Sequence, residues 1–176
     1  LLLVAAGGVL LAYYGWQRRQ VRQQFTAALA AIESKDWPAV KGAIDGLAGR
    51  SRYEPHVLFL RASVLAGRGD HRGALYELSA VRAEGELYEP VSLLLGECLY
   101  FTGDPVRAEQ VFRSLSAKNP NLVEAHRWLA GIYHQRGSMQ DARRALEQVV
   151  KLDPNDYRAY RQLGMLYHRD LANNKK

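Results

Sequence analysis

A repeat of 34 residues constrains the fold of this chain more than any other feature of its sequence. The recurring positions are a glycine (Gly69, Gly103, Gly137), an alanine (Ala74, Ala108, Ala142) and a bulky apolar residue four positions later (Leu78, Phe112, Leu146). Prolines recur at the same interval at Pro120 and Pro154. Three residue classes that repeat together are far more specific than a short motif, so a chance pattern is a weak alternative.

Each recurring residue has a physical role in a pair of helices. The glycine can adopt the left-handed conformation that ends a first helix, and the proline stops a second one. The alanine lets the two helices approach, and the apolar residue one turn later fills the space between them. Alternating strand patterns are absent, and 176 residues with 48% apolar content suit a domain with a real core. The sequence therefore predicts an all-α fold.

The repeat resembles the tetratricopeptide repeat family, which implies a right-handed α-solenoid of antiparallel helix pairs. The expected units are a degenerate helix pair at 21–54, repeats at 55–88, 89–122 and 123–156, a first helix of a further or capping repeat at 157–170, and a polar tail at 171–176. Repeat 55–88 departs from the pattern with Arg61 in place of leucine and Glu86 in place of proline. The degenerate pair has Lys35 at the glycine position and Val40 at the alanine position.

The N-terminal segment has the order of residues expected where a helix leaves a membrane. Residues 1–16 carry no charge, and arginines follow directly. The residues expected at the membrane interface are Tyr13, Tyr14, Trp16, Arg18 and Arg19. Seven basic residues against three acidic ones between Gln17 and Arg52 add attraction to anionic lipid. We therefore expect a single-pass transmembrane anchor at 1–20, with the repeats on the cytoplasmic side.

Two other interpretations of this segment stay open. A cleaved signal peptide would need small residues after the apolar core, whereas bulky tyrosines and a tryptophan follow here. A buried core helix would normally show a polar face, and residues 1–16 show none. Sixteen apolar residues are slightly fewer than the roughly 20 that a span needs. Because the sequence begins with Leu rather than Met, we expect residues upstream to complete the span.

Residues that would carry catalysis, metal binding or nucleic-acid binding are not found in a recognisable pattern. The sequence has no phosphate-binding glycine loop, His-Glu-x-x-His, Cys-x-x-Cys or Gly-x-Ser-x-Gly motif. His134 and His168 are one repeat apart, too distant on adjacent helices to share a zinc ion. Cys98, in an apolar stretch, is expected to be buried. We expect no enzyme activity, cofactor, small-molecule substrate or nucleic-acid partner.

The resemblance implies a concave groove lined by the first helix of each repeat. The residues expected to contact a partner there are Phe59, Leu93, Glu97, Tyr100, Arg127, His134, Arg158 and Arg161. They form an apolar middle and a basic C-terminal part, which suits a partner segment with acidic groups or a terminal carboxylate. The alternative is an ordinary solvated helix face. The clamp by which some family members capture chaperone C-termini is not expected, because Glu124 stands where that clamp has a base.

Two functions follow as hypotheses. The first is a membrane-anchored adaptor that binds a partner segment in the groove and helps to assemble a complex. The alternative is a permanent structural subunit of a membrane complex, held partly through small residues of the apolar helix such as Ala5, Ala6, Gly7 and Gly8. An enzyme is a third hypothesis, and it would need catalytic residues outside this sequence.

Overall fold

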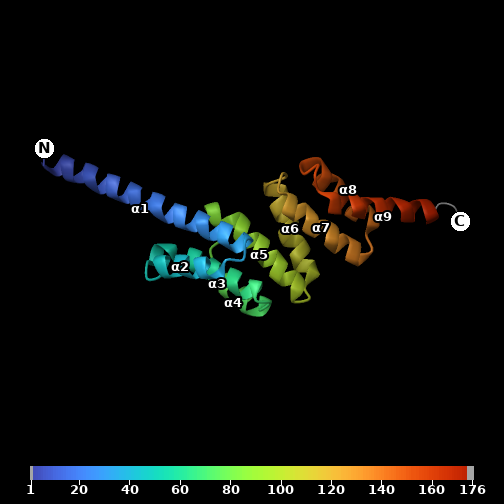
Figure 1. The fold of residues 1–176 in the computed structure, drawn as a ribbon, viewed down its shortest axis with the longest axis horizontal. Coiled ribbons are helices and arrows are strands. Elements are labelled where there is room, and N and C mark those ends of the chain that lie inside the picture. The colour runs from blue at the N-terminus through green and yellow to red at the C-terminus, as the bar shows by residue number, and fades with distance from the viewer. Residues whose placement is uncertain (1, 174–176) are drawn as a thin grey trace. The chain divides into compact units, whose positions relative to one another are not determined.

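A computed structural model describes the backbone of residues 2–173 and the side chains of residues 16, 19–50 and 52–168 (Figure 1). Within these residues all regular structure is helical, which confirms the all-α prediction. The α-helices are α1 (Leu2–Glu33), α2 (Trp37–Leu47), α3 (Glu54–Gly67), α4 (His71–Ser79), α5 (Tyr88–Phe101), α6 (Pro105–Lys118), α7 (Val123–Arg136), α8 (Met139–Leu152) and α9 (Tyr157–Asn173). Short 3₁₀ turns precede α3 and α5, at Ser51–Tyr53 and Gly85–Leu87.

The helices form two compact units, Leu1–Arg82 and Ala83–Lys176. In the first unit α1 packs on α2, α2 on α3 and α3 on α4. In the second unit α5 to α9 pack in the same sequential way. Each helix thus buries its apolar face against its neighbours in the chain, as expected where the connections are only a few residues long.

The turns within the helix pairs have the backbone geometry that the repeat predicts. Gly69, Gly103 and Gly137 have φ angles of 85°, 89° and 81°, which confirms their left-handed conformation. The aspartate that follows the first two glycines caps the next helix: the backbone N–H of Gly73 donates to Asp70 Oδ1 at 2.8 Å. The pair Gly-Asp therefore ends one helix and begins the next within two residues.

The alanine positions lie at the centre of the helix pairs. Ala74, Ala108 and Ala142 are fully buried. Phe112, four residues after Ala108, is also fully buried, and its ring stacks on Trp128 with the ring centroids 5.4 Å apart. The small and bulky classes of the repeat therefore form the core of the helix pairs, as predicted.

The prediction of a membrane anchor is wrong. α1 is one helix from Leu2 to Glu33, so the expected anchor at 1–20 and the first helix of the degenerate pair are continuous. No helix in the described part of the chain combines the length and the apolar character that a membrane crossing needs. The cause is composition: glycines, tyrosines and arginines interrupt the apolar residues within any window long enough to span a bilayer. The predicted membrane localisation and the predicted orientation of the repeats depended on this anchor, so they are wrong for the same reason.

The residues predicted at a membrane interface are only partly described. Trp16 is exposed, with 58% of its surface accessible, and Arg19 is exposed as well. The side chains of Tyr13, Tyr14 and Arg18 lie outside the described residues.

Candidate partner-binding groove

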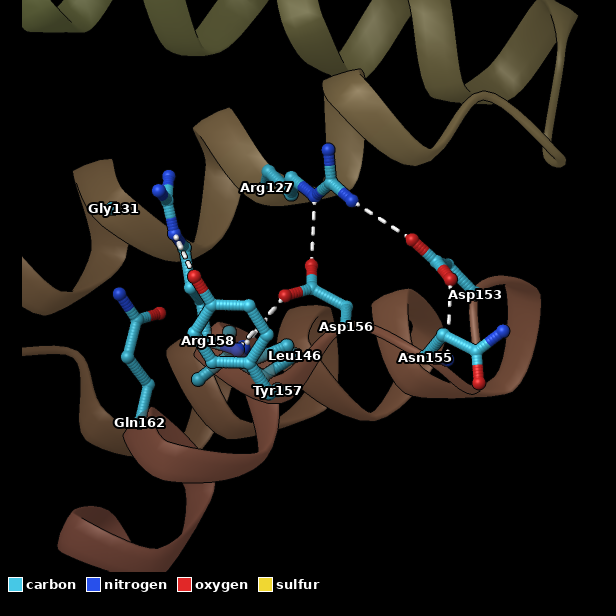
Figure 2. A pocket seen from close by; sticks show the side chains of 10 residues that line it. Arg127, Gly131, Leu146, Asp153, Asn155, Asp156, Tyr157, Arg158 and Gln162 are labelled. Atoms are coloured by element: carbon cyan, nitrogen blue, oxygen red, sulfur yellow. Dashed lines mark hydrogen bonds and ion pairs between the residues drawn. The ribbon is translucent and has the colours of Figure 1, made fainter.

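A cavity of about 460 Å³ lies in the second unit, where α7 faces the start of α9 (Figure 2). It is lined by Arg127, Gly131, Leu146, Asp153, Asn155, Asp156, Tyr157, Arg158, Ala159 and Gln162. Two of the predicted contact residues, Arg127 and Arg158, are therefore brought together in one site. We call this site the α7–α9 groove.

Arg127 is engaged by carboxylates of its own chain. Its Nε donates to Asp156 Oδ2 at 2.9 Å, and its Nη2 donates to Asp153 Oδ2 at 3.0 Å (Figure 2). Glu124, one turn earlier on α7, adds a third acid at 3.7 Å. The guanidinium thus ties α7 to the α8–α9 connection, and its charge is balanced within the protein. The repeat position of Arg127 predicted partner binding, and the acids that pair with it instead lie 26 and 29 residues later in the sequence.

Asp156 links this arginine to the start of α9. Its Oδ1 accepts hydrogen bonds from the backbone N–H groups of Arg158 and Ala159, both at 3.0 Å, as an N-capping side chain does. Partial burial alone would raise the pKa of Asp156. The hydrogen bonds from Ala159, Arg127 and Arg158 and the charge of Arg127 outweigh it, so the pKa is lowered. The carboxylate therefore stays ionised where it holds two helices.

Gly131 lines the groove in the middle of α7. A Cβ atom at this position would meet nothing within 4 Å, so no packing contact requires a glycine. A glycine inside a helix costs roughly 0.5–1 kcal/mol relative to alanine. What the missing side chain provides is space in the groove.

The basic residues left for a partner are on α9. Arg158 and Arg161 are both exposed, and no ion pair joins either to a carboxylate among the described side chains. Arg158 Nε donates to the hydroxyl of Tyr157 at 3.4 Å, and this hydrogen bond raises the pKa of Arg158. His134, on α7, is exposed as well. Of these residues Arg158 lines the groove, whereas Arg161 and His134 do not, so the groove offers one cation of α9 that no described carboxylate pairs.

The structure differs from the prediction at Phe59. This ring is 4% exposed and packs edge-on against Phe25 of α1, with centroids 6.0 Å apart. It belongs to the core of the first unit and is not an exposed anchor. No repeat position predicts this contact, because Phe25 lies in the degenerate pair and matches no repeat position closely.

The predicted residues of α5 lie in the second unit. Leu93, Glu97 and Tyr100 are half-buried. The ring of Tyr100 packs edge-on against Trp128 of α7, with centroids 5.4 Å apart. Cys98 beside them is fully buried, as predicted, and burial together with the charge of Glu97 raises its pKa to about 12. Its thiol therefore stays protonated.

A search of the described residues for a metal centre finds no group of three or more histidine, cysteine or carboxylate side chains that could hold an ion.

Comparison with known proteins identifies the family. A tetratricopeptide repeat model matches residues 65–123 and again 102–164, which together span more than half of the chain. The chain belongs to the tetratricopeptide repeat family. This confirms the resemblance drawn from the 34-residue repeat. No curated protein sequence matches the chain.

Solved structures of tetratricopeptide repeat proteins have a similar fold. The first such domain of the human RPAP3 protein aligns with a TM-score of 0.60 at 14% identity, covering 70% of this chain and 98% of that one. A crystal structure of MamA aligns with a TM-score of 0.64 at 17% identity, covering 81% and 84%. A MamA RS-1 ArsTM double mutant aligns with a TM-score of 0.65 at 18% identity, covering 85% and 84%. At these identities the likeness shows the fold, an α-solenoid, and a fold of this family is an interaction scaffold.

Proposed function

We propose that this protein is a non-catalytic scaffold that binds a segment of a partner protein in the α7–α9 groove and thereby helps to assemble a protein complex. The observation that carries the proposal is the combination of open space at Gly131 with unpaired cations on α9. A partner backbone can approach the helix where no side chain intervenes. Arg158 and Arg161 can then pair with acidic side chains or a terminal carboxylate of that partner.

The test is a pull-down with the full chain as bait, comparing the native protein with Gly131→Leu and with Arg158→Glu/Arg161→Glu. The Cβ atom of Gly131→Leu would meet nothing within 4 Å, and the rest of its side chain would fill the open groove, so the fold is expected to survive. We expect both variants to lose the same partner. Lys151→Glu, an exposed charge reversal on α8, serves as the matched control and should retain it. A partner retained by both groove variants would contradict the proposal.

A second function, permanent structural subunit of a complex, is favoured by the exposed apolar side chains of α9. Four large apolar side chains are exposed there: Tyr157, Tyr160, Met165 and Tyr167, at 69%, 50%, 58% and 45%. Exposed apolar patches of this kind mark interaction sites or cause aggregation. A permanent subunit should precipitate when it is separated from its complex, whereas a free scaffold should stay monodisperse by itself.

A further inference from the structure

A second cavity, of about 550 Å³, lies in the first unit and is unrelated to the α7–α9 groove. It is lined by α2, α3 and α4 through Trp37, Pro38, Lys41, Ile44, Arg61, Val64, Leu65, Arg68 and Glu77, and we call it the α2–α4 pocket. Its floor consists of the apolar side chains of Trp37, Ile44, Val64 and Leu65. All four are only half-buried, so their surface is accessible to a ligand.

The indole of Trp37 packs directly over Gly67 in this floor. A Cβ atom on Gly67 would lie 2.2 Å from the ring of Trp37, so only glycine permits this placement. The aromatic floor is therefore built into the packing of α2 on α3.

The rim of the pocket is basic, and its positive charges are not paired with any described acidic side chain. Lys41, Arg61 and Arg68 are exposed, and none of them forms an ion pair with a described residue. Glu77 is the one acid that lines the pocket within the described residues. Arg61 stands where the family has leucine, so a cation replaces an apolar residue at the edge of the apolar floor.

The second unit contains the same site with its charges paired. Its cavity, of about 320 Å³, is lined by Pro105, Val106, Glu109, Ile132, Gln135 and Arg136. Two 34-residue repeats separate Lys41 from Glu109, and the same interval separates Arg68 from Arg136. Glu109 Oε2 accepts a hydrogen bond from Arg136 Nη1 at 2.6 Å, and Glu109 is 9% exposed. The first unit thus presents two cations where the second has an internal ion pair.

We propose that the α2–α4 pocket binds an acidic, apolar segment of a partner protein, in which a carboxylate takes the place beside Arg68 that Glu109 occupies beside Arg136. The spacing of the cations suits a segment of a partner. Arg61 on α3 and Arg68 at the C-cap of α3 are about two helical turns apart, about 10 Å at 1.5 Å per residue. Acids spaced along a helix or an extended chain can pair with both cations. An apolar side chain between those acids fits the floor around Trp37.

The test uses a phage-displayed library of random 16-residue peptides, selected on the full native chain and counter-selected on Lys41→Glu. The variant supplies internally the carboxylate that Glu109 supplies in the second unit, so its melting temperature should be equal to or higher than that of the native protein. We expect the selected peptides to carry at least two acidic residues that flank a leucine or an aromatic residue. A selected peptide, made synthetically, should bind Lys41→Glu at least tenfold more weakly than the native protein. The same peptide with its acidic residues replaced by glutamine should lose a similar factor in affinity for the native protein.

Arg158→Ala/Arg161→Ala is the matched control, because it removes two cations from α9 and leaves the pocket intact. The peptide should bind this variant with unchanged affinity, which separates the pocket from the α7–α9 groove. Failure to select any peptide that depends on Lys41, or selection of neutral or basic peptides, would overturn the proposal. Two other results would also overturn it. One is a concentration-dependent dimer of the native chain in sedimentation velocity that Lys41→Glu abolishes. The other is Lys41-dependent binding of a fatty acid, laurate, when no peptide is selected.

Discussion

Lys35 has a backbone conformation that its side chain disfavours. Its φ angle is 59°, and among the described residues it is the one non-glycine residue with positive φ. It occupies the repeat position at which Gly69, Gly103 and Gly137 adopt the same conformation. A left-handed backbone costs an L-residue roughly 1–2 kcal/mol. The tight turn between α1 and α2 therefore forms despite its sequence.

We expect Lys35→Gly to raise the free energy of unfolding of the first unit by about 0.5–1 kcal/mol. The substitution removes the cost of the left-handed backbone, and the greater flexibility of glycine in the unfolded chain cancels part of that gain. Urea denaturation of the native and variant proteins measures it. Lys41→Gly is the control: the same exchange inside α2 should lower the free energy of unfolding by about 1 kcal/mol. A loss of stability in Lys35→Gly would show that the turn is not strained.

Two glycines in first helices give opposite predictions for the same substitution. A Cβ atom on Gly96 would lie 2.5 Å from the ring of Phe112, which is held from the other side by Trp128. Gly96→Ala should therefore cost about 1–3 kcal/mol of stability through overpacking. Gly131→Ala meets nothing within 4 Å and should stabilise by about 0.5–1 kcal/mol. Thermal melts of both variants test this, and equal signs would contradict it.

At the scale of elements, the carboxylate of Asp156 links the start of α9 to Arg127 of α7. Its pKa is lowered, so its contribution to stability is complete above the ordinary aspartate value of about 3.9 and is lost as pH falls through the lower folded pKa. Asp156→Asn keeps a capping side chain but loses the charge that pairs with Arg127. We expect this variant to be less stable than the native protein at pH 7 and to differ little near pH 2.

The measurement is the free energy of unfolding from urea titrations between pH 2 and pH 7. Arg127→Met provides the control, because Asp156→Asn should have a smaller pH-dependent effect once the arginine is absent. An effect of Asp156→Asn that is the same size at every pH would mean that the carboxylate acts only as a cap.

The helices themselves could be predicted from sequence wherever the repeat is strong. Gly-Asp pairs such as Gly103 and Asp104 define the turns, because left-handed glycine and an N-capping aspartate act locally. α1 could not be predicted in the same way. Its apolar beginning suggested a separate anchor, whereas Phe25 further along packs on Phe59 and makes α1 part of a core.

The candidate sites were predictable only in part, because charge pairing depends on tertiary contacts. The repeat position of Arg158 predicted its place on the groove, whereas Arg161, predicted in the same way, does not line it. The pairing of Arg127 with Asp153 and Asp156 could not be predicted, since the repeat fixes which helix a residue lies on but not which acid its side chain reaches.

At the scale of the whole molecule, the two compact units have separate cores. Phe112 is fully buried in the second unit, and Leu60 is fully buried in the first. Between the units, residues 81–84 have no regular secondary structure. A large-to-small change in one core should therefore act on one unit, because repeat proteins transmit stability only through contacts between neighbouring repeats.

We expect Phe112→Ala to destabilise the second unit by about 3–5 kcal/mol and to leave the first unit nearly unchanged. The tryptophans allow each unit to be followed: with Trp16 replaced by Phe, Trp37 reports on the first unit and Trp128 on the second. Urea titration of proteins with one of these two tryptophans should show that Phe112→Ala shifts the Trp128 transition alone. Equal shifts at both tryptophans would instead mean that the units unfold as one cooperative block.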